Sequence, residues 1–86
     1  MQSEHFINLC KEGLIDVLSK VYHEEFDPSD FHLVWFNKTL ANFKCILIDL
    51  KENERMYECA YSDIDNKIYI DVYEKVVNSV HKVKGE

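Results

Sequence analysis

Apolar side chains recur with helical spacing over the first quarter of the chain. Projected at about 100° per residue, they form a stripe about 120° wide that lies opposite a polar side. The spacing predicts a helix over Ser3 to Tyr22, with Ser3 as its N-cap. Gly13 lies inside this segment and predicts a close approach to another element, since glycine lowers helix stability. The stripe comprises Phe6, Ile7, Cys10, Leu14, Val17, Leu18 and Val21.

Short runs rich in β-branched and aromatic residues follow, separated by polar reversals. Ahead of them, Asp27 and Pro28 predict a single helical turn. Polar turns are expected at Lys51–Glu54 and Asp63–Asn66, and such short connections make neighbouring strands antiparallel. The runs therefore predict a four-stranded meander over His32–Lys38, Phe43–Leu50, Arg55–Ser62 and Lys67–Ile70.

The pattern after the fourth run fits a helix better than a strand. Between Val72 and Val83 the apolar residues do not alternate, but on a helix they fall within about 140°. Asp71 and Glu74 would then form a capping box, and a strand remains the alternative because valines weaken helices. The predicted fold class is α+β, with an N-terminal helix, a four-stranded antiparallel meander and a C-terminal helix in one domain over residues 3–84.

Both faces of the first two predicted strands are apolar. Strict alternation places Leu33, Trp35, Phe43, Cys45 and Leu47 on one side and Val34, Phe36, Ile46 and Ile48 on the other. Two helices cover one face, so the second face needs another cover. A second copy of the chain is the favoured candidate, which predicts a homodimer. The alternatives are a monomer with a helix on each face, and a docking surface for a foreign protein.

Charge and composition exclude several classes of function. The formal net charge is −6 and the basic residues form no stripe, so nucleic-acid binding is not expected. The four histidines have no metal-ligand spacing, and two glycines cannot build a phosphate-binding loop, so neither cofactor nor enzyme activity is predicted. The odd number of cysteines matches no disulfide framework, so Cys10, Cys45 and Cys59 are interpreted as buried hydrophobes.

A cytoplasmic location is expected. The chain shows no signal-peptide pattern and no apolar run long enough to span a membrane. The candidate partner-binding residues lie around the reversal between the first two strands and are Trp35, Lys38, Asn42 and Lys44. Hairpin structure alone is the competing explanation for the polar ones.

Three stretches resemble a family of small uncharacterised proteins from phages and prophages of Gram-positive bacteria. They are Val34–Lys44, Met56–Tyr61 and Lys67–Lys75, and Phe6–Lys11 also fits. The chain departs from that pattern at Asn37 and Ala41, where the family often has Cys and Gln. The resemblance implies a phage product acting inside a bacterial host cell, and it brings no known activity or catalytic residues.

The leading hypothesis is a non-enzymatic phage accessory protein that acts by binding another protein, as a homodimer. The first alternative is a small regulator of nucleic-acid transactions, which either binds a strand or blocks a DNA-binding protein. The second is a small-molecule binder or minimal enzyme.

Overall fold

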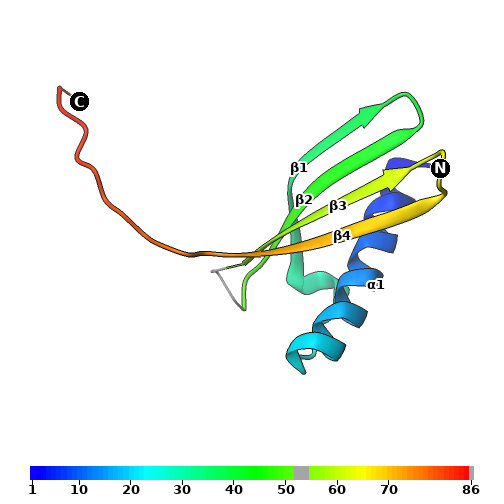
Figure 1. Cartoon of the computed structure of the whole chain (residues 1–86), viewed down its shortest axis with the longest axis horizontal. Coiled ribbons are helices and arrows are strands. Elements are labelled where there is room, and N and C mark those ends of the chain that lie inside the picture. The colour runs from blue at the N-terminus through cyan, green and yellow to red at the C-terminus, as the bar shows by residue number, and fades with distance from the viewer. Residues whose placement is uncertain (52–54, 86) are drawn as a thin grey trace.

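A computed structural model of the chain describes residues 1–51 and 55–85 and shows one helix packed on one four-stranded sheet (Figure 1). The helix is α1 (Ser3–Tyr22), followed by a single 3₁₀ turn, η1 (Pro28–Asp30). The strands β1 (Phe31–Thr39), β2 (Asn42–Asp49), β3 (Arg55–Ser62) and β4 (Lys67–Glu74) form an antiparallel meander in the order β1-β2-β3-β4. Among the described residues, no helix is long and apolar enough to cross a membrane.

The helix termini predicted from the sequence are confirmed only in part. Asp27 and Asp30 form a reciprocal capping box around η1, with Pro28 at the start, as predicted. The expected N-cap at Ser3 is wrong by one residue, because Ser3 is already helical and the cap position is Gln2, without a side-chain cap bond. His23 ends α1 in the left-handed region at φ 56°.

The sheet has a bulge in β1. Leu33 pairs with Leu47, but Trp35, and not Val34, pairs with Ile46, so one extra residue is accommodated between the two pairs. Leu33 and Trp35 therefore lie on opposite faces, and the prediction that they share a face is wrong. The reason is that strict alternation holds only in a strand without an inserted residue.

The core lies between α1 and one face of the sheet. Phe6, Cys10, Leu14 and Leu18 from α1 meet buried side chains that alternate along β2 and β3. Gly13 marks a close approach, as predicted, because a Cβ atom built there would lie 2.4 Å from Cδ1 of Ile70 in β4. The buried strand residues are Phe31, Phe43, Cys45, Leu47, Tyr57 and Cys59.

The predicted C-terminal helix is wrong. β4 continues past Ile70 to Glu74, where Asp71 pairs with Glu58 and Glu74 pairs with Arg55, so neither residue caps a helix. Residues 75–83 have no regular secondary structure. Valines lower helix propensity, and a helix of nine residues is too short to form on its own in water. The predicted turn at Lys51–Glu54 lies partly outside the described residues, whereas that at Asp63–Asn66 is confirmed.

Candidate functional site

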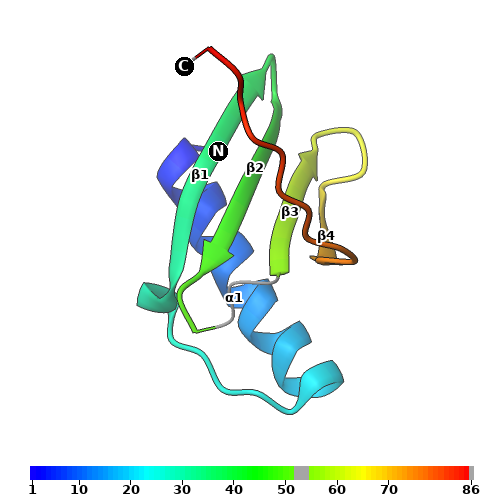
Figure 2. The same ribbon diagram turned by 90° about the vertical axis from the view of Figure 1, so that its left-hand side faces the viewer.

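One face of the sheet is not covered by α1, and we call it the open face. Figure 2 views the molecule with the sheet in front of the helix. The buried positions of β2 and β3 face α1, so the alternate positions and their cross-strand partners define the open face. These residues are His32, Trp35, Asn37, Thr39, Asn42, Lys44, Ile46, Ile48, Met56, Glu58, Ala60, Ser62, Lys67, Tyr69, Asp71 and Tyr73.

Aromatic and aliphatic side chains form a large part of this face. Trp35 is 44% exposed, Tyr69 49% and Tyr73 47%. Ile46 and Ile48 in the central strand β2 are half-buried. Exposed aromatic residues beside aliphatic ones are typical of protein-binding surfaces and rare on a surface that faces only water.

A single ion pair crosses the open face. Lys44 Nζ in β2 lies 2.9 Å from Glu58 Oε1 in β3. The hydrogen bond to Glu58 raises the pKa of the Lys44 ammonium group. Asp71 is a second, exposed carboxylate on the neighbouring strand. The face is therefore apolar at the end formed by Ile48, Met56 and Tyr73, polar at the opposite end, and has one basic and two acidic groups across its middle.

The four candidate residues from the sequence do not form one cluster. Trp35 and Lys44 share the open face, one strand apart. Lys38 lies on the other side of the sheet, with its Nζ atom 5.3 Å from the centre of the Phe43 ring. Asn42 has a structural role, because its Oδ1 atom accepts a hydrogen bond from the backbone N–H of Asp63 at 2.9 Å. Three of the four candidates thus lie on the side of the open face, and Asn42 is used for a local hydrogen bond.

Sequence reasoning missed the contribution of β4 to this face. Tyr69, Asp71 and Tyr73 alternate with Ile68, Ile70 and Val72, which is the pattern of a half-covered strand. The prediction of a helix from Val72 onward cut this pattern short. Tyr69 was already placed in the predicted fourth strand, and reading the alternation through to Glu74 would have added Asp71 and Tyr73.

The segment 75–83 leaves β4 on the side of the sheet opposite α1 (Figures 1 and 2). All residues from 75 to 85 are exposed. Val76 is 97% exposed and Val80 84%, and Val77 and Val83 are also largely in solvent. We call residues 75–83 the valine tail.

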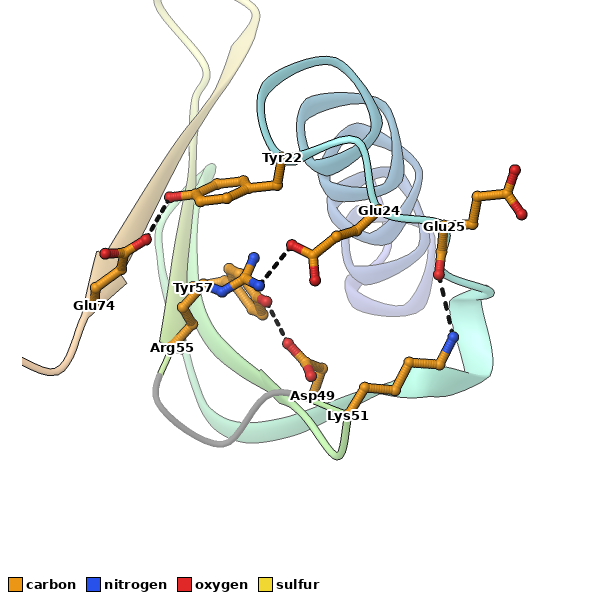
Figure 3. A network of polar contacts seen from close by, with 8 residues as sticks. All are labelled: Tyr22, Glu24, Glu25, Asp49, Lys51, Arg55, Tyr57 and Glu74. Atoms are coloured by element: carbon orange, nitrogen blue, oxygen red, sulfur yellow. Dashed lines mark hydrogen bonds and ion pairs between the residues drawn. The ribbon is translucent and has the colours of Figure 1, made fainter.

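A network of polar side chains lies at the end of the sheet where α1 finishes (Figure 3). The buried Tyr57 hydroxyl donates to Oδ2 of Asp49, which is itself buried. Arg55 places Nη2 2.6 Å from Oε1 of Glu24 and its guanidinium 4.4 Å from the centre of the Tyr22 ring. Burial, and then the bond to Asp49, raise the pKa of the Tyr57 hydroxyl. The network joins the segment after α1 to β2 and β3.

The lysine after β2 extends the same network. Lys51 Nζ donates to the carbonyl oxygen of Glu25 at 3.1 Å and lies 3.2 Å from Oδ2 of Asp30. An open pocket of about 350 Å³ lies beside it, lined by Ile15, Ser19, Glu24, Glu25, Phe26, Asp27 and Lys51. The contacts of Lys51 hold the segments that line this pocket against one another. We therefore assign a structural role to the network.

The three cysteines meet in the core, and the prediction that they are buried is confirmed. The Sγ atoms of Cys10, Cys45 and Cys59 lie within 4.8 Å of one another, and all three residues are fully buried. Three thiolates would suit a soft ion such as Cu(I), but ionising them would bury charge among apolar side chains. Hydrogen bonds to the other two thiols, and then burial, raise the pKa of Cys10 and keep it protonated. We assign the cluster to packing where α1 approaches the sheet.

These features define a small α+β protein with one sheet face packed on a helix and the other presented for contact. Residues 7–83 match the model of a family of unknown function, DUF6275. The match covers most of the chain, including the valine tail, and the chain therefore belongs to that family. No curated protein matches the sequence, and no solved structure matches it.

Proposed function

We propose that the protein is a non-enzymatic phage or prophage accessory protein that works by binding another protein through the open face, as a homodimer. The open face carries the proposal. Its aromatic residues are about half exposed and its isoleucines are half-buried, whereas the positions that alternate with them in β2 and β3 are buried beneath α1. A sheet with apolar residues on both sides is stable when both sides are covered.

The membership in a family of unknown function leaves the activity open, and the phage origin rests on the resemblance of the sequence. The charge distribution supports protein rather than nucleic acid as the partner. The open face has two lysines: the Nζ atom of Lys44 is paired with Glu58, and Lys67 lies at one end of the face. A surface that neutralises phosphates needs several unpaired basic side chains in a row.

The oligomeric state tests this proposal directly. We expect sedimentation velocity to show a monomer–dimer equilibrium, and the emission of the single tryptophan, Trp35, to shift to shorter wavelength as the protein concentration rises. Ile46→Lys in the middle of the open face should abolish both effects. Val21→Lys is the matched control, because Val21 is 65% exposed on α1, on the other side of the molecule.

A wild-type chain that stays monomeric at all concentrations would contradict the homodimer. A dimer that tolerates Ile46→Lys as well as Val21→Lys would show that another surface forms the interface.

A further inference from the structure

Two apolar surfaces of this chain lack a cover, and they lie on the same side of the sheet. One is the open face and the other is the valine tail, which extends beyond β4 away from α1 (Figure 1). The valines of the tail are between 73% and 97% exposed. Apolar groups on a segment that contacts nothing gain free energy from any apolar surface they reach.

From this pairing we propose that the valine tail of one copy docks on the open face of a second copy, and that the exchange is reciprocal. The inference rests on the proposed function, since it names the partner of the same face. Each copy then supplies one tail and one face, which gives a closed two-fold assembly.

Charge favours this occupant. Residues 1–74 contain fifteen acidic and seven basic residues, whereas the tail contains Lys75 and Lys82 and no acidic residue. The open face presents Asp71 and Glu58 across its middle, with Lys44 Nζ bound to Glu58, and has Lys67 at its polar end. A basic segment is thus complementary to a body with an excess of negative charge, and two bodies without the tails repel each other.

The spacing of the valines also suits docking on a sheet. Val76, Val80 and Val83 recur at intervals of four and three residues, which places them on one side of a helix. A helix of this length is unstable alone in water but gains stability when its apolar side is buried. A helix docked on the open face would supply the second covering layer that the sheet lacks.

The direction of the chain favours a second copy over the tail's own sheet. Figure 1 shows that the tail extends away from the sheet beyond β4. Docking on its own face requires a reversal immediately after Glu74, and Lys75, Val76 and Val77 are poor turn residues. Docking on a neighbouring copy needs no such reversal.

Mixing two defective variants tests the exchange. The first variant ends after Glu74 and keeps an intact face; the second is Ile46→Lys and keeps an intact tail. Each alone should be monomeric. Mixed in equal amounts, they should form a heterodimer in sedimentation velocity, held by one tail on one face, at least tenfold weaker than the wild-type dimer. Circular dichroism should show helical signal rising with the concentration of the wild-type chain.

The controls separate this inference from the proposed function. Val76→Asp combined with Val80→Asp should remove the dimer, whereas Lys82→Gln should weaken it by a few-fold in low salt. If the chain without its tail still dimerises but Ile46→Lys does not, the open face is an interface and the tail exchange is wrong. If the two variants fail to associate while the wild type dimerises, the exchange is also overturned. A monomeric wild type overturns both proposals.

Discussion

The two faces of the sheet come from the same strands but differ in nearly every physical property. The face beneath α1 has fully buried residues, aromatic contacts and a cluster of thiols. The open face has half-exposed tyrosines, a tryptophan and an ion pair. Neighbouring residues of one strand therefore have two environments: one set is packed against α1, and the other lies on the open face.

The strongest test of this difference compares Leu47 with Ile46, which are neighbours in β2. Leu47 is fully buried beneath α1, so Leu47→Ala should lower the free energy of unfolding by about 3 kcal/mol. Ile46 is half-buried on the open face, so Ile46→Ala should cost about 1 kcal/mol. Urea denaturation at a concentration where the chain is monomeric measures both. Equal losses would contradict the asymmetry of the two faces.

The hydroxyl of Tyr57 gives the next largest effect. Tyr57→Phe leaves the buried carboxylate of Asp49 without this donor and should cost about 2 kcal/mol. Because the pKa of Tyr57 is raised in the folded chain, both states keep the proton below about pH 10, and above it the unfolded chain loses its proton first. Stability should therefore fall as the pH rises above 10.

Tyr69→Phe on the open face is the matched control for this pH dependence. Tyr69 is exposed, and its hydroxyl donates to Asp65 at 3.0 Å. The decrease in stability measured by urea denaturation from pH 9 to pH 11 should be clearly shallower for Tyr57→Phe than for Tyr69→Phe. Identical slopes for the two variants would show that the buried hydroxyl does not govern the alkaline response.

The smallest expected effect is the coupling energy of two ion pairs, Lys44–Glu58 on the open face and Arg55–Glu24 at the end of α1. A double-mutant cycle with Lys44→Met and Glu58→Gln should give a coupling of about 0.5 kcal/mol that falls with added salt, since Lys44 is half exposed. A cycle with Arg55→Met and Glu24→Gln should give about 1.5 kcal/mol with less dependence on salt, since the side chain of Arg55 is 7% exposed. The reverse order would show that the pair at the end of α1 is the more hydrated one.

The elements with a single repeating pattern were predicted correctly from the sequence. α1 has an unbroken helical stripe, and short connections separate the four strand-forming runs, so helix and meander followed from periodicity and connection length. The apolar character of both faces in β2 was also visible. These features depend on the spacing of apolar and polar residues along the chain, which can be read directly from the sequence.

The features that depend on tertiary contacts or on one inserted residue were missed. The valines after Glu74 fit a helical stripe, but no surface of the same chain covers them, so the predicted helix is absent. The bulge next to Val34 changes the face of the residues that follow, and no residue type marks it. The thiol cluster joins one helix to two strands, so spacing along the chain does not reveal it.

The bulge in β1 has a consequence for how copies of the chain can meet. β1 lies at the edge of the sheet, and an edge strand with regular pairing groups can recruit the edge of another molecule without limit. An extra residue bends that edge and interrupts its row of donors and acceptors. Growth into fibres through β1 is thereby disfavoured.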